Sequence, residues 1–254
     1  EATSVPLVVT GAGLYLIGGE MLALGQLYSV SYSITANYAF AVLPTFLFMG
    51  NLAMASGMAT ELYTAADRWL GHLRGGLYLA TISGATGFAA ISGSPLVNAT
   101  VFTRLSLPEM LRLGYSRSLS GACIASAGTL AALIPPSIGM VVYGILTEQS
   151  IGALFIAGIL PGLLLAVAFA VYVSVSSRVS TQEQTRPRAG LPEIVATARS
   201  AIAPLLLPVA VLGGIYSGYF TVSEAAAVGV IGALLIALFV YRTLTWRALY
   251  EAAH

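Results

Sequence analysis

The sequence lacks lysine entirely and contains one aspartate, one cysteine and two histidines among its 254 residues. Without a lysine it cannot complete a phosphate-binding Walker loop, which excludes direct ATP coupling within this chain. Cys123 can form neither an intrachain disulfide nor a thiolate metal cluster, so we expect a small packing residue. Asp67, His72 and His254 are too few to build a serine–histidine or double-aspartate active site. The sequence therefore does not indicate an enzyme and requires no cofactor.

Charged residues are also scarce, at 8% of the sequence, whereas 57% of the residues are hydrophobic and the mean hydropathy is +0.88. A soluble fold of this composition would lack polar surface, so we expect an all-α integral membrane protein with several transmembrane helices in a lipid bilayer. A net charge of +1, spread among loops, gives no reason to expect a nucleic-acid partner. Runs of about 20 residues span a bilayer, and such runs are expected at residues 5–25, 38–57, 119–146, 151–177, 202–217 and 222–241.

Two clusters of helix-breaking residues interrupt long apolar stretches, namely Ser92-Gly93-Ser94-Pro95 and Ile134-Pro135-Pro136-Ser137. In hydrocarbon every backbone amide and carbonyl needs a partner, so a membrane helix breaks only where protein or a water-lined cavity supplies one. The first cluster predicts a re-entrant helical hairpin over residues 76–102, and the second predicts a proline-broken helix. Transporters use such breaks to bind ions and substrates.

The candidate binding groups are the hydroxyls and free carbonyls of these two breaks, with one amide on the returning limb of the hairpin. Two prolines remove amide donors and leave upstream carbonyls free, and the side-chain amide is expected to cap or steady the turn. Hard cations accept such oxygen ligands. The alternative is that both clusters are packing turns in which Ser and Gly let helices approach closely, as the Gly158–Gly162 spacing also allows. The candidates are Ser92, Gly93, Ser94, Pro95, Asn98, Ile134, Pro135, Pro136 and Ser137.

The distribution of cations predicts the topology. If residues 76–102 re-enter, all eleven arginines fall on one side, whereas the opposite connections at residues 26–37, 147–150 and 218–221 contain none. The positive-inside rule makes the arginine side cytoplasmic. A complete crossing would instead separate Arg68 and Arg74 from the other arginines.

Glu224 lies near the start of the last apolar run. One turn from a helix amino end, a glutamate is favoured by the helix dipole and by capping geometry, so a structural role is expected over ion coupling. Thr221 or Ser223 would cap that helix.

Short motifs occur along the chain in a fixed order: Leu43-Pro44-Thr45-Phe46, Gly75-Gly76-Leu77, Ile91-Ser92-Gly93-Ser94, Leu133-Ile134-Pro135-Pro136-Ser137, Gly158-Ile159-Leu160-Pro161-Gly162 and Phe220-Thr221-Val222-Ser223-Glu224-Ala225-Ala226. This ordered set resembles the large membrane (permease) subunit of tripartite ATP-independent periplasmic (TRAP) transporters of the dicarboxylate type. At the hairpin tip, Pro95 replaces the small Ser or Ala more usual in that family.

The resemblance implies a sodium-coupled secondary transporter, a symporter of the bacterial inner membrane that works by an elevator motion. It would import an organic acid, a carboxylate, delivered by a periplasmic binding protein, together with a small membrane subunit. The resemblance would also place one Na⁺ between the hairpin tip and the proline break, with Ser92, Ser94, Pro135 and Ser137 as the best candidates. The alternative function is a passive channel or structural membrane subunit without ion coupling, since broken helices also line pores.

The large subunit of this family is longer, with two inverted halves that each carry a hairpin, and the sequence contains only the first hairpin. We therefore expect a fragment, the alternative being that a separate polypeptide completes the site. Residues 1–74 would form a first scaffold part with two spans and a cytoplasmic arm. Residues 75–177 would form the first half of the transport domain, residues 178–200 a polar cytoplasmic linker, and residues 201–254 the start of a second scaffold part.

Overall fold

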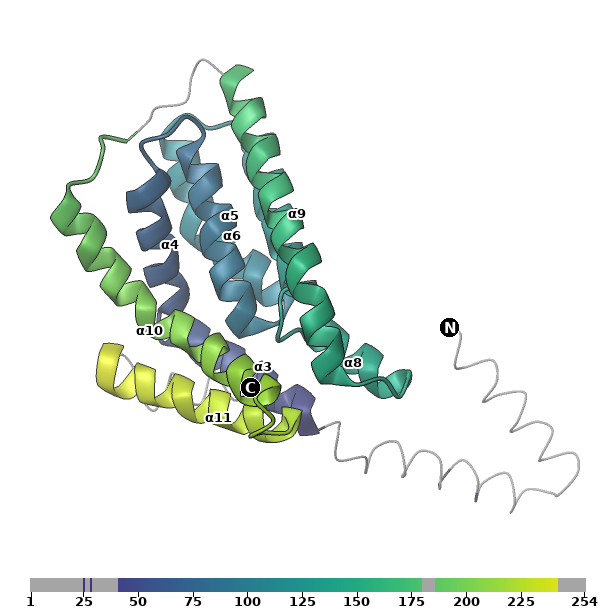
Figure 1. Ribbon diagram of the computed structural model, residues 1–254. Coiled ribbons are helices and arrows are strands. Elements are labelled where there is room, and N and C mark those ends of the chain that lie inside the picture. The colour runs from purple at the N-terminus through teal and green to yellow at the C-terminus, as the bar shows by residue number, and fades with distance from the viewer. Residues whose placement is uncertain (1–24, 26–27, 29–40, 180–185, 242–254) are drawn as a thin grey trace, which may run out of the picture. The chain divides into compact units, whose positions relative to one another are not determined.

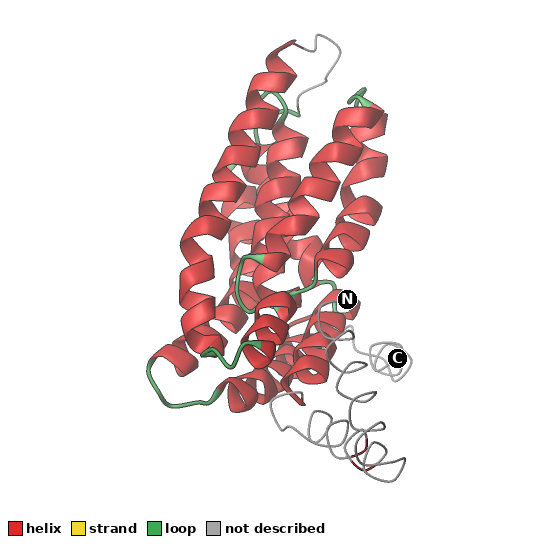
Figure 2. Ribbon diagram, turned by 90° about the vertical axis from the view of Figure 1, so that its right-hand side faces the viewer, coloured by secondary structure: helices red, strands yellow, loops and turns green. Residues whose placement is uncertain are grey.

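The computed structural model describes residues 41–179 and 186–241, together with Gly25 and Tyr28. The chain divides into two compact units, residues 1–41 and 42–254. Figure 2 shows helices and no strand in the described part, which confirms the all-α prediction. The predicted span at residues 5–25 lies outside the described residues apart from Gly25. The second unit contains α3 (Val42–Ala55), α4 (Met58–Leu70), α5 (Gly76–Ser92), α6 (Pro95–Arg112), α7 (Arg117–Thr129), the 3₁₀ turn η2 (Leu130–Ala132), α8 (Ile138–Leu146), α9 (Ile151–Val179), α10 (Leu191–Tyr216), α11 (Val222–Leu235) and the π-helical η3 (Ile236–Tyr241).

Helix α5 lies at the centre of this unit. It packs against α3, α4, α6, α7, α9 and α10, and its side chains Leu77, Tyr78 and Phe88 are completely buried. A helix that is apolar on all sides is stable only when neighbours surround it. In Figure 1, α4, α5, α6 and α9 run side by side, whereas α3 and α11 pack together at one end of these helices.

Within the described residues, three helical segments are long and apolar enough to cross a membrane: Ile151–Ser177, Leu191–Tyr216 and Val222–Tyr241. The first and third match the predicted spans at residues 151–177 and 222–241. A bent pair formed by α3 and α4 could supply a fourth span. The structure therefore confirms a multi-span helical protein, and two of the predicted spans differ in their bounds.

The predicted span at residues 38–57 corresponds to α3, which is followed directly by a second helix. Helix α3 ends at Ala55, and after a bend of 60° the chain continues as α4. Gly57 has a φ of 86° at this joint, in the left-handed region that favours glycine. Helix α4 is amphipathic and buries Leu62 and Tyr63. Its polar face lowers the mean hydropathy, so a search for apolar runs misses it.

The polar stretch at residues 178–200 is also more helical than predicted. Helix α9 continues to Val179, and α10 begins at Leu191 instead of residue 202. Pro192 lies in the first turn of α10 and Glu193 follows it; both residue types favour the amino end of a helix. The charges at residues 193–199 therefore belong to the first turns of a long helix, which hydropathy alone assigns to a linker.

The predicted hairpin is present as two helices joined by a sharp turn. Helix α5 ends at Ser92, and α6 starts at Pro95 and continues past residue 102 to Arg112. Phe102 on α6 packs against Tyr63 on α4, with ring centroids 6.2 Å apart. At 17 residues, α5 is about 25 Å long, just short of a hydrocarbon core. This length fits the predicted re-entrant geometry.

The predicted proline-broken helix is confirmed. Helix α7 and η2 lead into a turn at residues 133–137, after which α8 begins at Ile138, and the Pro135–Pro136 peptide bond is cis. The 13 residues of α7 cover about 20 Å, and the nine residues of α8 cover about 14 Å. The turn therefore lies between two helical segments that are each too short to span a bilayer.

Glu224 has the structural role that the sequence predicted. Thr221 caps α11 by accepting a hydrogen bond from the Glu224 amide at 3.3 Å. The Glu224 carboxylate accepts one in return from the Thr221 amide at 2.8 Å. This reciprocal pair is a capping box, and it identifies Thr221 instead of Ser223 as the cap.

Replacing Thr221 with Ala should destabilise the protein by about 1 kcal/mol, because the cap and one partner of the box are lost. In a chain of this size that corresponds to a decrease of about 2–4 °C in the unfolding midpoint, measured in detergent. Ser223→Ala is the matched control and should leave the midpoint unchanged. Equal decreases for both variants would show that Thr221 is not the cap.

The orientation predicted from the arginines can be tested at the two ends of α9. Ser150 precedes this 29-residue helix and Arg188 follows it. In a Cys123→Ser background, Ser150→Cys should react with a membrane-impermeant maleimide added to intact spheroplasts. Arg188→Cys should react only in inverted vesicles, because the positive-inside rule places it in the cytoplasm. The reversed labelling pattern would contradict the topology.

Candidate cation and substrate site

The tip of the hairpin is the turn between α5 and α6. Gly93 has a φ of 59°, which lets the chain reverse where α5 ends. The Ser94 hydroxyl accepts a hydrogen bond from the Val97 amide at 3.5 Å and thus caps α6. Pro95 occupies the first turn of α6, where its missing amide hydrogen costs nothing. The sequence expected Asn98 to cap or steady this turn, and the structure assigns the cap to Ser94.

The break between η2 and α8 is closed by its own side chains. The Ser137 hydroxyl donates a hydrogen bond to the Ala132 carbonyl at 2.8 Å across the turn. Ile134, Pro135, Pro136 and Ser137 are all buried. Pro136 has no amide hydrogen to donate to the Ala132 carbonyl. The Ser137 hydroxyl takes the place of that missing donor.

The structure brings the two predicted breaks into direct contact. The Ile138 amide, the first of α8, donates a hydrogen bond of 3.1 Å to the Gly93 carbonyl at the hairpin tip. A Cβ atom added to Gly93 would lie 2.5 Å from the Pro136 carbonyl oxygen. Gly93 and Ile138 are 45 residues apart in sequence, and the amide of one turn provides the donor that the carbonyl of the other turn needs.

Four ends of helical segments meet at this contact. The carboxyl ends of α5 and η2 present backbone carbonyls, and the amino ends of α6 and α8 present backbone amides. A helix carries about half an elementary positive charge at its amino end and about half a negative charge at its carboxyl end. The contact therefore offers carbonyl ends suited to a cation beside amide ends suited to an anion.

Two buried polar oxygens near the tip have no hydrogen-bond partner among the described residues: the Ser92 hydroxyl and the Asn98 side-chain carbonyl. Ser92 is 1% exposed and Asn98 is fully buried. The Asn98 amide nitrogen donates to the Ala85 carbonyl at 3.2 Å and to the Ala127 carbonyl at 3.3 Å. It therefore ties α5, α6 and α7 together. Buried polar atoms rarely lack partners, so both oxygens are candidate ligands.

Other predicted groups are already engaged. The Gly93 carbonyl, expected to be free at the tip, accepts the Ile138 amide, and the Ser94 and Ser137 hydroxyls have the local partners described above. These contacts do not exclude a cation, because each carbonyl oxygen has a second lone pair. They do shift the emphasis toward Ser92 and Asn98, and the assignment of all nine residues to a binding site stays a prediction.

Glycines on neighbouring helices let the chain pack closely around the breaks, as their spacing predicted. A Cβ atom at Gly158 of α9 would lie 2.5 Å from the Leu133 carbonyl oxygen, and one at Gly162 would lie 2.9 Å from the Ile134 side chain. On the other side, a Cβ atom at Gly50 of α3 would lie 3.0 Å from the Ser92 backbone. Gly50 was not predicted to be part of the site.

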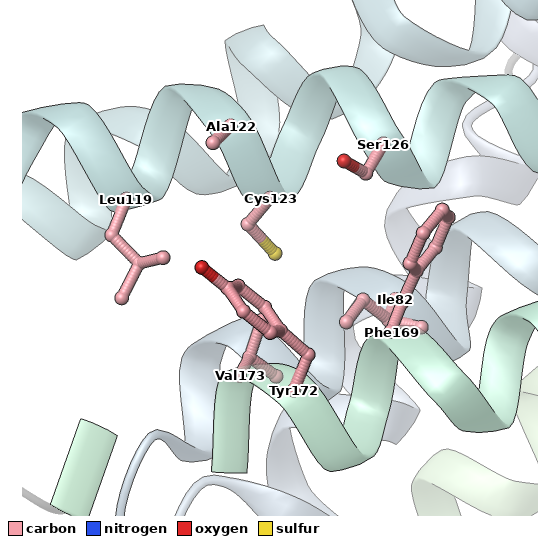
Figure 3. Close-up of a pocket in the computed structure, with 8 residues that line it drawn as sticks. All are labelled: Ile82, Leu119, Ala122, Cys123, Ser126, Phe169, Tyr172 and Val173. Atoms are coloured by element: carbon pink, nitrogen blue, oxygen red, sulfur yellow. The ribbon is translucent and has the colours of Figure 1, made fainter. Parts of the chain in front are cut away.

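Cys123 behaves as the packing residue that the sequence predicted. Figure 3 shows it on α7 beside Ile82 of α5 and Tyr172 and Val173 of α9, around a small cavity of about 40 Å³. Its neighbours are mainly apolar, its thiol donates a weak hydrogen bond to the Tyr78 carbonyl at 3.8 Å, and only 4% of the residue is exposed.

A polar cluster at the arginine-rich end escaped the sequence analysis. Arg186 forms ion pairs with Asp67 on α4 and Glu109 on α6. Hydrogen bonds from Arg112 and then Arg186 keep the pKa of Glu109 below its usual value. Arg186 is 119 and 77 residues from its two partners, so no local pattern joins them. The available signal was that the chain's single aspartate lies one turn before the end of an amphipathic helix.

The contact between the tip and the break predicts that Gly93→Ala is more destabilising than an ordinary substitution of a left-handed glycine. The backbone conformation alone should cost about 1–2 kcal/mol, and the added methyl group also meets the Pro136 carbonyl. Gly218→Ala is the matched control, because Gly218 has a φ of 76° and no atom within 4 Å of an added Cβ. Equal decreases in the unfolding midpoint would contradict the tight contact.

Comparison with known families gives one match that covers nearly the whole chain. Residues 2–254 match the family described as "Tripartite ATP-independent periplasmic transporter, DctM component". This description of a transporter component confirms that the chain is not an enzyme.

The relatives include a C4-dicarboxylate TRAP transporter large permease of Pseudomonas aeruginosa, 42% identical over 83% of this chain and 49% of the relative. An ectoine large permease of Halomonas elongata is 37% identical over 98% of this chain and 59% of the relative. A sialic acid large permease of Vibrio cholerae is 34% identical over 85% and 50%, respectively. The chain thus spans about half the length of these relatives. It belongs to the DctM family of TRAP transporter large permease components.

Proposed function

We propose that this chain supplies the first half of the transport pathway of a sodium-coupled TRAP permease that imports an organic acid across the bacterial inner membrane. Its partners would be a periplasmic binding protein, a small membrane subunit and the polypeptide segment that forms the second half of the permease. The observation that carries the proposal is the meeting of the hairpin tip with the proline break, joined by the hydrogen bond between Ile138 and Gly93.

The helix ends at this contact support a carboxylate substrate. The amino ends of α6 and α8 come together there, and transporters direct such ends at anionic groups of their substrates. The relatives described above are named for C4-dicarboxylate, ectoine and sialic acid. Each of these compounds contains a carboxylate, so the shared chemical feature of the substrates matches the electrostatics of the site.

The oxygen atoms at the tip support sodium as the coupling ion. Na⁺ is a hard cation that takes carbonyl, hydroxyl and amide oxygens as ligands. The Ser92 hydroxyl and the Asn98 side-chain carbonyl are buried without partners among the described residues, and the carboxyl ends of α5 and η2 lie nearby. A bound cation would remove the cost of leaving these oxygens unpaired.

Among the described residues, the tip is left open on one side. Leu96, next to Pro95 in the first turn of α6, is 81% exposed. A leucine so close to the site requires a cover, either lipid or protein. We infer that the second half of the permease packs over this face and completes the ion and substrate sites.

Ser92→Ala should raise the half-saturating sodium concentration about tenfold, equivalent to about 1.4 kcal/mol of lost ion binding. The measurement is C4-dicarboxylate uptake into proteoliposomes that contain the complete transport system, with sodium replaced by choline in the reference. Ser120→Ala is the matched control: its hydroxyl is also fully buried without a partner among the described residues, but it lies on α7 near the arginine-rich end.

A sodium-dependent increase in the unfolding midpoint provides a second readout, since a ligand that binds only the folded state stabilises it. Ser92→Ala should reduce this increase and Ser120→Ala should not. Unchanged sodium dependence in Ser92→Ala, at normal protein levels, would reject the assignment. Uptake that persists without sodium would favour a passive channel.

A further inference from the structure

Residues 186–190, the segment before α10, are fastened to α4 and α6 by the Arg186 side chain. The Arg186 guanidinium donates hydrogen bonds to Asp67 on α4, at 2.5 Å, and to Glu109 on α6. Its backbone amide donates to the Gly71 carbonyl, just after α4, at 3.2 Å. Arg186 therefore joins the carboxyl end of α4 to the carboxyl end of the second limb of the hairpin.

The two carboxylates depend on Arg186 to different degrees. The Asp67 side chain is 6% exposed and, among the described residues, Arg186 is its ion-pair partner. Removing the guanidinium would leave a buried charge uncompensated, which is strongly unfavourable. The Glu109 side chain is 22% exposed and also accepts hydrogen bonds from Arg112, at 2.9 Å and 2.6 Å. Glu109 can thus lose Arg186 and remain paired.

Helix α10, which follows this segment, is also attached to α4. The Trp69 indole donates to the Ile194 carbonyl at 3.4 Å, and Arg68 lies 3.8 Å from Glu193. In the part of the chain that the structure describes, the ion pair with Glu109 is the one that links this segment to α6. The segment and the start of α10 are therefore held to α4 and to Gly71, just after it, at several points, whereas Arg186 supplies the ion pair to α6.

We propose that Arg186 is a one-sided clasp, which stays bound to Asp67 and releases Glu109 when the hairpin moves. The inference rests on the proposed transport function, because only a moving hairpin requires the release. In the arrangement that the structure shows, the clasp holds the end of α6 against α4. After Arg186 has released Glu109, Arg112 remains paired with it, so the carboxylate is never left without a cation.

Two cross-linking experiments distinguish a releasable contact from a fixed structural one. In a Cys123→Ser background, cysteines at positions 109 and 186 are joined by a short reducible bis-methanethiosulfonate, and a second protein carries cysteines at positions 67 and 186. The 109–186 cross-link should abolish uptake and reduction should restore it, because α6 can no longer leave. The 67–186 cross-link should leave uptake unchanged. Normal uptake with the 109–186 cross-link in place would overturn the proposal.

Hydrogen exchange provides a test that needs no transport and keeps the Asp67 pair intact. Glu109→Gln should speed amide exchange at residues 106–112 about fivefold, the range of a partly exposed ion pair, and leave residues 64–70 of α4 unchanged. Glu193→Gln is the matched control and should leave exchange in α6 unchanged. Absence of the change in α6 would contradict the clasp. The two tests also distinguish failure of the clasp from failure of the proposed function. If Glu109→Gln speeds exchange in α6 but the parent protein shows no sodium-dependent uptake, the proposed function is wrong and the contact with Arg186 is a fixed structural one.

Discussion

A break in a helix within hydrocarbon leaves backbone groups that must find partners inside the protein, and the two breaks of this chain supply partners for each other. The Ile138 amide at the start of α8 reaches the Gly93 carbonyl at the end of α5. The Ser94 and Ser137 hydroxyls satisfy groups within their own turns. The hairpin and the broken helix are therefore not independent features, because each makes the other tolerable in a membrane.

This mutual satisfaction also sets the chemistry of the site. Once two interrupted elements are joined, their carbonyl ends and amide ends necessarily lie near one another, and the helix dipoles provide a place for a cation beside a place for an anion. The coupled transport of sodium and a carboxylate that we propose would use this pairing of charges. In that proposal the buried oxygens of Ser92 and Asn98 would add neutral ligands without a fixed negative charge, which would suit an ion that binds and leaves in each cycle.

The opposite end of the hairpin follows a different principle. Arginines accumulate there, as expected for the cytoplasmic side, yet Arg186 has a specific role in addition to its charge. It compensates the buried Asp67 and reaches Glu109, so that α4, α6 and the segment before α10 converge on one guanidinium. Backbone groups thus organise the tip of the hairpin, and ionised side chains organise its opposite end.

The sequence by itself determined the membrane class, the spans at residues 151–177 and 222–241, the two breaks, the capping role of Glu224 and the family, because hydropathy, Pro and Gly placement and ordered motifs are local signals. It missed α4 and the early start of α10, where polar residues on one helix face lower the mean hydropathy. Only the tertiary structure decided which oxygens near the tip remain unpaired and that Arg186 meets Asp67. Those outcomes depend on contacts between residues 45 to 119 positions apart, and such contacts follow from packing and leave no periodic trace in the chain.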